Sequence, residues 1–188
     1  MLQTKAPPIT RYDYEEMPQG PPYYQVIEGD LVMSPSPETF HQQVARNLMF
    51  LLGSYLEKHP VGEIFAAPLD VYLNENNVYQ PDVIFILNKH RSIIRDKGIE
   101  GTPDLVVEIL SPGTERYDKG SKRKIYARTG VTELWIVDPV TKVIHVYYLQ
   151  KDAETPAAAY AANAVFKSAL FPGLKIKAAA IFKSSLRK

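Results

Sequence analysis

Apolar residues recur at helical spacing between positions 37 and 58, and they predict the clearest long helix of the chain. The stripe consists of Phe40, Val44, Leu48, Leu51, Leu52 and Tyr55. Ser36 is a suitable N-cap for this helix and Pro37 a suitable first residue. Pro60 and Gly62 end it. The pattern therefore predicts a helix that lays one face on a core.

Short apolar runs on both sides of this helix have the composition of strands. A polar helix is expected at residues 10–17, followed by a tight hairpin in YYQVIEGDLVM around Gly29-Asp30. Beyond the long helix, strands are predicted in GEIFAA, PLDVYL, VYQPDVIFIL and DLVVEIL. The last run is almost continuously apolar, which is typical of a strand covered on both faces of its sheet.

The second half of the chain adds one more helix and further strands. The helix is predicted from Glu115 to Arg128, with Thr114 as a possible N-cap and Gly130 at its end. VTELWIVDP and KVIHVYYLQ then form a strand pair, an alanine-rich segment reads as strand or loop, and a short helix closes the chain. This order predicts an α/β or α+β fold with a mixed sheet, and 188 residues suit a single domain with an N-terminal arm at residues 1–22.

The composition excludes several classes of protein. Twenty-two lysines and arginines against 21 acidic residues give a net charge of +1, which excludes a strongly basic, histone-like binder. The absence of cysteine excludes disulfides, thiolate nucleophiles and cysteine-ligated metals. The chain has no apolar run long enough for a membrane span and no signal-peptide core at its start, so we expect a cytoplasmic enzyme or binding domain.

The common cofactor and nucleophile motifs are missing as well. The four histidines show no metal-binding spacing, and neither a dinucleotide fingerprint, a Walker sequence nor a G-x-S-x-G elbow occurs. Candidate chemistry therefore rests on carboxylates and lysines.

Glu108 interrupts the apolar strand DLVVEIL. Strand alternation places Val106 and Leu110 on the same face as Glu108. An ionised carboxylate among such neighbours is costly unless it is paired or binds a metal. Glu108 is therefore either a structural ion-pair partner or a functional residue.

Asp82 opens another apolar strand directly after Pro81, a position that puts it near one end of the sheet. The alternative is an aspartate that only initiates a strand, because the same dipeptide occurs again at Pro103-Asp104.

Lys122 points toward the core side of the second predicted helix. Its direction lies within about 10° of the mean of Ile125 and Tyr126, whereas Lys124 points the opposite way. Asp118, one turn earlier, could hold its ammonium group. The alternative is a lysine whose stem passes the core on its way to solvent. Two carboxylates and one ammonium group suit a magnesium ion, which binds carboxylates together with water and substrate phosphate.

Longer segments of the chain resemble the Uma-two family. The resemblance rests on QPDVIFI and GTPDLVVEILSPGTERYDKGSKRKIYARTGVTELWIVDP, with support from YYQVIEGDLVMSPSPETFHQQVARNL and GEIFAAPLDVYL. It covers residues 10–182, and the family is placed in the restriction-endonuclease-like PD-(D/E)XK superfamily.

The resemblance implies a restriction-endonuclease-like core of mixed sheet flanked by helices, with the N-terminal hairpin and C-terminal strands as additions. It also implies hydrolysis of DNA phosphodiester bonds with Mg²⁺ or Mn²⁺. Asp82 matches the motif aspartate and Glu108 the (D/E) position, so both become metal ligands and catalytic residues. Leu110 stands where the motif has lysine, and Lys122 of the next helix matches the lysine that takes over this role.

The sequence offers three secondary candidates. His41 falls within about 20° of the centre of the apolar stripe on the first long helix, where a hydrogen-bonded core histidine is the alternative. The resemblance also favours a histidine at this position. Glu38 lies at the edge of that stripe, and Asp118 lies one turn before Lys122.

The basic residues of the second helix form a candidate contact to nucleic-acid phosphates, or else a solvated helix surface. They are Arg116, Lys119, Arg123 and Lys124. Two functions remain open: a metal-dependent endonuclease, or an inactive nucleic-acid-binding or structural module that retains the fold. Exposed Phe50, with Met49 beside it, also predicts a homodimer contact.

Overall fold

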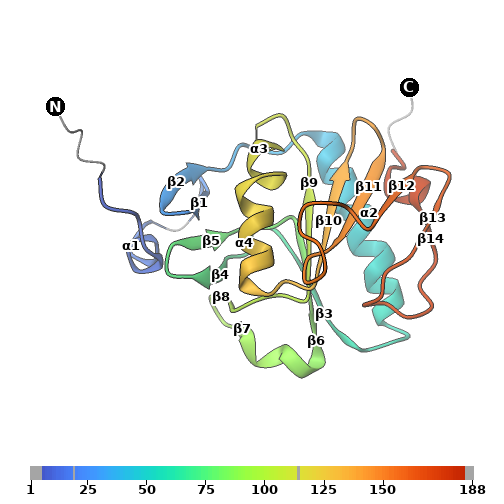
Figure 1. Cartoon of the computed structure of the whole chain (residues 1–188), viewed down its shortest axis with the longest axis horizontal. Helices are drawn as coiled ribbons and strands as arrows, with labels where there is room; N and C mark the ends of the chain where they lie inside the picture. The colour runs from blue at the N-terminus through green and yellow to red at the C-terminus, as the bar shows by residue number, and fades with distance from the viewer. Residues whose placement is uncertain (1–5, 19, 114, 185–188) are drawn as a thin grey trace.

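A computed structural model describes residues 6–18, 20–113 and 115–184 (Figure 1). Within these ranges the strands form two six-stranded sheets and one two-stranded sheet. In the same residues no helix is long and apolar enough to cross a membrane. The mixed α+β architecture with helices on its sheets confirms the predicted fold class.

The central sheet carries the candidate residues. Its strand order is β12-β11-β10-β9-β6-β3, where β9 and β10 are parallel and the other pairs are antiparallel. The bounds are β3 Gly62–Ala66, β6 Val83–Leu87, β9 Leu105–Ile109, β10 Glu133–Asp138, β11 Val143–Tyr148 and β12 Ala158–Ala161. All five residues of β9 are buried, as its continuous apolar pattern predicts.

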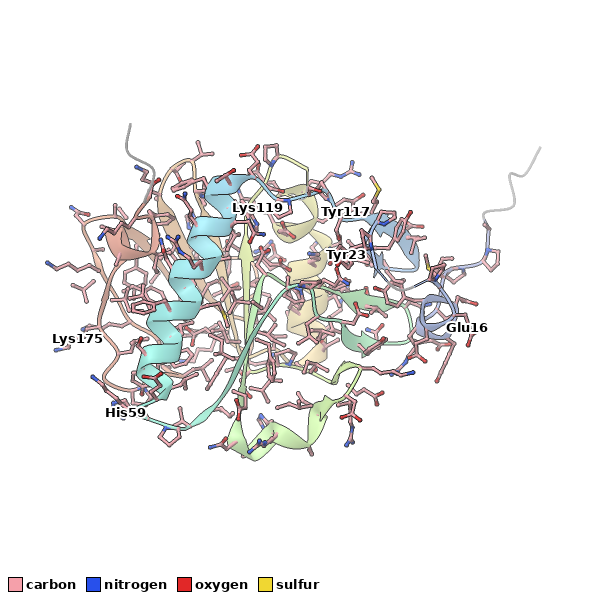
Figure 2. The ribbon with its side chains drawn as sticks, turned by 180° about the vertical axis from the view of Figure 1, so that it is seen from behind. Glu16, Tyr23, His59, Tyr117, Lys119 and Lys175 are labelled. Atoms are coloured by element: carbon pink, nitrogen blue, oxygen red, sulfur yellow. The ribbon has the colours of Figure 1, made fainter. Side chains whose placement is uncertain are left out.

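Helices cover both faces of this sheet. Helix α4 (Ser121–Thr129) crosses the face nearest the viewer in Figure 1, and α2 (Thr39–Leu56) lies behind it and comes to the front in Figure 2. Val44, Leu48 and Leu52 of α2 are fully buried against one face. Ile125 and Tyr126 of α4 are buried against the other. Strand alternation therefore directs each sheet residue toward one helix or the other.

The predicted N-terminal hairpin belongs to a second sheet. That sheet has the order β2-β1-β5-β4-β8-β7. The bounds are β1 Tyr24–Ile27, β2 Asp30–Met33, β4 Val71–Asn74, β5 Asn77–Tyr79, β7 Ile94–Arg95 and β8 Gly98–Glu100, and the 3-10 helix η1 spans Asn88–Ile93. Helix α1 (Arg11–Glu15), in the predicted N-terminal arm, packs here through Tyr14, whose hydroxyl hydrogen-bonds with Asp70 and the Tyr24 carbonyl. The single-domain organisation stays a prediction.

Two helix boundaries differ from the sequence prediction. Helix α2 begins at Thr39 with Glu38 as its N-cap, so Ser36 and Pro37 precede the helix instead of starting it. The second helix is interrupted: α3 spans Glu115–Asp118, and α4 begins only after Gly120. A Cβ atom at Gly120 would lie 2.6 Å from the Arg116 carbonyl oxygen, so the break requires glycine. Thr114, the possible N-cap, lies outside the described residues.

The C-terminal segment folds back onto α2. Its elements are β13 Val165–Phe166, β14 Ile176–Lys177 and α5 Ala178–Ile181. Phe166 contacts Trp135 edge-on, with ring centroids 4.5 Å apart, and the ring of Phe171 is tilted against Trp135 at 6.1 Å. The Asn47 amide donates to the carbonyls of Ile181 and Lys183. These contacts complete the core on the α2 face of the sheet.

Candidate active site

Glu108 lies near the end of β9 on the face that α4 covers. Its side chain is 3% exposed. The Lys122 ammonium group donates to Oε1 at 3.1 Å, and the Tyr126 hydroxyl donates to the same oxygen at 2.5 Å. One carboxylate oxygen is thus held by α4, and the other, Oε2, makes no hydrogen bond to the described residues.

Lys122 sits between two carboxylates. Its Nζ lies 3.0 Å from Asp118 Oδ1, the one-turn contact that the spacing predicted, and 5.7 Å from the centre of the Tyr79 ring. Burial by itself lowers the pKa of Lys122, but Glu108 and Asp118 more than offset this, so the net shift of the pKa is upward. The lysine is therefore a buried cation that remains charged.

Negative charge exceeds positive charge around Glu108. Burial raises the pKa of Glu108, the charge of Lys122 acts in the opposite direction, and Asp118 and Asp82 raise the pKa further. Glu108 therefore holds its proton more tightly than an exposed glutamate does. A divalent cation bound beside it would displace this proton and offset the charge of the carboxylate.

Asp82 immediately precedes β6 and adjoins Glu108 across the β6–β9 pair. Val83 pairs with Val107, so the next antiparallel register position brings Asp82 opposite Glu108. Asp82 Oδ2 accepts a 2.7 Å hydrogen bond from the Ile109 backbone N–H. Its side chain is 20% exposed, so Asp82 is the more accessible of the two carboxylates.

His41 connects α2 to this end of the sheet. Its Nε2 lies 2.9 Å from the Ile109 carbonyl oxygen and 3.3 Å from Asp82 Oδ2. Since a carbonyl only accepts, Nε2 carries a hydrogen. Burial lowers the pKa of His41, but the contact with Asp82 outweighs it and the net shift of the pKa is upward. His41 is thus both a core histidine and a partner of the candidate metal ligand.

The candidate side chains line one cavity of about 740 Å³. Asp82, Glu108, Asp118, Lys122 and His41 all contribute to its lining. They come from four different elements or their ends: β6, β9, the α3–α4 segment and α2. A volume of this size accommodates a ligand larger than a metal ion and its water.

The donor set fits a magnesium-type ion rather than a fully protein-coordinated metal. Within the described residues, no group of three or more His, Cys, Asp or Glu side chains has metal-binding geometry. Asp82 and Glu108 offer carboxylate oxygens beside a cavity, and Mg²⁺ binds through one or two carboxylates while retaining water and substrate oxygens. These two residues would hold it.

Glu38 and Arg123, two of the predicted site residues, do not contribute to the lining of this cavity. Glu38 is exposed at the start of α2. Arg123 is 9% exposed, and its guanidinium group donates to the Ala153 and Glu154 carbonyls and to the Glu154 carboxylate. This arrangement leaves little of Arg123 for a phosphate, since the side chain joins α4 to the loop after β11.

The other predicted nucleic-acid contacts are on the surface. Lys119 pairs with Glu115 at 2.5 Å, and the Arg116 guanidinium lies 4.5 Å from the centre of the Tyr117 ring. Lys124 is exposed on the outer face of α4. Contact of these three residues with nucleic acid stays a prediction.

Tyr126 is a site residue that the sequence interpretation treated only as core. A signal was present, because Tyr126 lies one helical turn after Lys122 on the stripe that faces Glu108. A tyrosine in that place needs a partner for its hydroxyl, and the buried carboxylate is the acceptor within reach.

Comparisons with known proteins agree with the fold and with the resemblance to the Uma-two family. A family model described as "Uma2: Putative restriction endonuclease" matches residues 11–179. The fold is similar to the crystal structure of "a putative nuclease belonging to DUF820" from Anabaena variabilis, with a TM-score of 0.78 and 19% identity over 93% of this chain and 98% of that chain. The "Uncharacterized protein slr1290" of Synechocystis sp. is 40% identical over 53 residues, which is 28% of each chain. Because the family model spans most of its length, the chain belongs to the Uma2 family.

Proposed function

We propose that this protein is a metal-dependent nuclease that hydrolyses phosphodiester bonds of DNA. The observation that carries the proposal is the convergence of Asp82, Glu108 and Lys122 on the lining of a single cavity. The description of the family and the name of the structural neighbour support a nuclease-like function. The two carboxylates with an adjacent cavity support Mg²⁺ or Mn²⁺ as the metal.

The reaction consumes one water for each bond cleaved. A water oxygen bonds to phosphorus, one P–O ester bond breaks, and the departing oxygen takes up a proton, which leaves a phosphate monoester and a hydroxyl group. When bound, the divalent cation supplies Lewis-acid chemistry at the phosphate and increases the nucleophilicity of water. Asp82 and Glu108 would hold that cation.

The surrounding residues position these carboxylates and balance charge. The Ile109 N–H and His41 fix Asp82, and Tyr126 fixes Glu108 Oε1. The Lys122 ammonium group lies beside Glu108 and would stabilise negative charge that develops on the phosphate. The superfamily motif has a lysine two residues after the (D/E) position, where this chain has Leu110. We infer that Lys122 of α4 supplies the missing ammonium group.

A digestion screen tests the proposal. Circular single-stranded, circular duplex and linear DNA are incubated with the protein in Mg²⁺, in Mn²⁺ and in EDTA. We expect cleavage in at least one of the metals and none in EDTA. Cleavage that persists undiminished in EDTA, or no cleavage of any DNA in either metal, would contradict the proposal.

The second candidate is an inactive nucleic-acid-binding or structural module. The observation that favours it is the ion pairing of Lys122 with both Glu108 and Asp118, an arrangement that also suits a purely structural lysine. DNA binding without any metal-dependent cleavage in the same screen would favour this function over the first.

We also propose that the exposed face of α2 forms a homodimer contact. Phe50 on this face is 71% exposed, but Met49 is partly buried against the core, so the apolar surface is smaller than the sequence predicted. Light scattering of the parent and of Phe50→Ser tests the contact. A dimer that Phe50→Ser dissociates supports it, and a monomeric parent at high concentration removes it.

A further inference from the structure

The cavity above Asp82 and Glu108 has an apolar wall. Tyr23 lies beside the β1–β2 hairpin on the side toward the middle of the molecule (Figure 2), and it is 39% exposed. Met33, from the same hairpin, is 57% exposed. Prolines complete the wall: Pro21, Pro22, Pro35, Pro37 and Pro68. A rigid wall with an accessible aromatic ring is the kind of surface on which a nucleobase stacks.

Positive charge is scarce on the same lining. Among the described residues that line the cavity, Lys122 is the one lysine or arginine, and its ammonium group is paired with two carboxylates. Duplex DNA is bound mainly through lysine and arginine contacts with its phosphates. Phosphate contacts with this lining would therefore be few for either form of DNA, so stacking of a base on Tyr23 has to carry the binding, and only an unpaired strand offers a base face for it.

The depth of the candidate catalytic groups also favours an unpaired strand. Glu108 and Lys122 are almost completely buried, so a phosphate approaches them only through the cavity. In a duplex the faces of the bases are stacked inside and cannot contact Tyr23. An unpaired strand exposes both its base faces and a flexible backbone that can enter.

We propose that the cavity binds an unpaired DNA strand, with a base stacked on Tyr23 and the adjacent phosphate near Asp82 and Glu108. This inference rests on the proposed nuclease function and specifies its substrate as single-stranded DNA. The prolines and Met33 exclude water around the stacked base, while the carboxylate end of the cavity receives the phosphate.

Fluorescence anisotropy with a labelled single-stranded oligonucleotide, and with the same sequence as a duplex, tests the inference. Ca²⁺ replaces Mg²⁺, and a gel confirms that the DNA remains intact. We expect tighter binding of the single strand. Tyr23→Ala should weaken it by about 5- to 150-fold, the effect of losing one base–aromatic stack. The variant should fold, because residue 23 is tied to the hairpin by its main-chain carbonyl, which accepts from the Ser34 N–H and is unchanged by the substitution.

Tyr12→Ala is the matched control. Tyr12 is 65% exposed on α1 and does not belong to the lining of the cavity. Glu16, the residue directly after α1, is labelled at the edge of the molecule in Figure 2. We expect the affinity of Tyr12→Ala to equal that of the parent. Salt dependence gives a further check. A plot of the logarithm of the single-strand binding constant against the logarithm of the salt concentration should have a slope no steeper than about −1.4, which corresponds to two phosphate contacts on a single strand.

The outcomes separate the inference from the nuclease proposal. Preferential duplex binding, or equal affinity of Tyr23→Ala and the parent for the single strand, overturns the inference even if the protein cleaves DNA. Single-strand binding that depends on Tyr23 supports the inference even if the digestion screen finds no cleavage, and in that case the nuclease proposal alone fails.

Discussion

Asp82 and Asp104 occupy matching positions at opposite ends of the β6–β9 strand pair. Each follows a proline and precedes its strand. Asp82 accepts a hydrogen bond from the Ile109 N–H at 2.7 Å, and Asp104 accepts one from the Leu87 N–H at 2.8 Å. Each aspartate therefore joins the start of its own strand to the end of the other.

The two aspartates differ in what surrounds them. Asp82 borders the cavity together with Glu108, whereas Asp104 is 4% exposed at the other end of β9 and outside the lining. Each also contacts a histidine: His41 lies 3.3 Å from Asp82, and His90 lies 2.9 Å from Asp104. The local backbone role is thus the same in both, and only the cavity distinguishes the candidate functional residue from the structural one.

Lys122→Met should affect both cleavage and stability. We expect the cleavage rate per folded molecule to fall by about 10²–10³-fold, since a group that stabilises developing charge is lost. The free energy of unfolding should fall by about 3–5 kcal/mol because Glu108 and Asp118 lose their shared counter-charge. Urea unfolding and initial cleavage rates measure the two effects.

Lys124→Met is the control for this substitution, because it removes the same charge from the exposed face of the same helix. Its unfolding free energy should stay within about 0.5 kcal/mol of the parent. Its cleavage rate at saturating DNA should equal that of the parent, and loss of a phosphate contact would at most weaken DNA binding. If Lys122→Met does not fold, Lys122→Arg is the second variant, because arginine keeps the positive charge beside Glu108 and Asp118. Cleavage by folded Lys122→Met at the rate of the parent would contradict a role for Lys122 in the reaction, whereas a rate lost in Lys122→Met and kept in Lys122→Arg would assign that role to the positive charge.

Tyr126→Phe removes one hydrogen bond from the buried Glu108 carboxylate. We expect a loss of about 1–3 kcal/mol in the free energy of unfolding, because a buried hydrogen-bonding oxygen of Glu108 loses a partner. If Tyr126 positions Glu108 for a metal, calorimetry should also show weaker Mg²⁺ binding. Tyr117→Phe is the control: the Tyr117 hydroxyl accepts a hydrogen bond from Arg116 at the surface, so its loss should leave the metal affinity unchanged. A stability loss with unchanged metal affinity would give Tyr126 a purely structural role.

The residues that the sequence located correctly are those whose direction depends on local periodicity. Alternation along β9 put Glu108 with Val106 and Leu110, and the helical period put Lys122 beside Ile125 and Tyr126; the structure has both sets in one buried cluster around α4. In each case a period of 2 or 3.6 residues is enough to decide the face.

The features that the sequence could not predict depend on contacts between distant segments. The second sheet is built from strands of two to four residues, and β4 pairs with β8 some 27 positions later, which no local pattern encodes. Arg123 is buried because Ala153 and Glu154 return to it. Tyr23 becomes part of the cavity because the hairpin lies against residues at the start of β6.

Glu133 should make stability depend on pH in a predictable direction. It is 1% exposed, and its carboxylate accepts hydrogen bonds from Trp135 and Ser168. Burial nevertheless raises its pKa above the ordinary value of 4.5. The folded protein thus holds the proton more tightly than the unfolded chain, so the contribution to stability is present below pH 4.5 and is lost as the pH rises through the folded pKa.

Comparison with Glu133→Gln isolates this contribution, because glutamine does not titrate. The unfolding free energy of the parent minus that of the variant, measured in urea over a series of pH values, should decrease as the pH rises. A difference that is flat or increases with pH would show that the pKa of Glu133 is not raised by burial.

The most direct test of a metal-dependent site at Asp82 is the cleavage rate of two matched variants. Asp82→Asn and Asp104→Asn each replace an aspartate of a Pro-Asp dipeptide by an isosteric amide that can still accept the backbone N–H. In Mg²⁺ or Mn²⁺ we predict that Asp82→Asn loses at least about 10²-fold in rate, while folded Asp104→Asn cleaves as the parent does. Equal rates for Asp82→Asn and the parent, or equal losses in both folded variants, would contradict the assignment of Asp82 to a metal-dependent nuclease site.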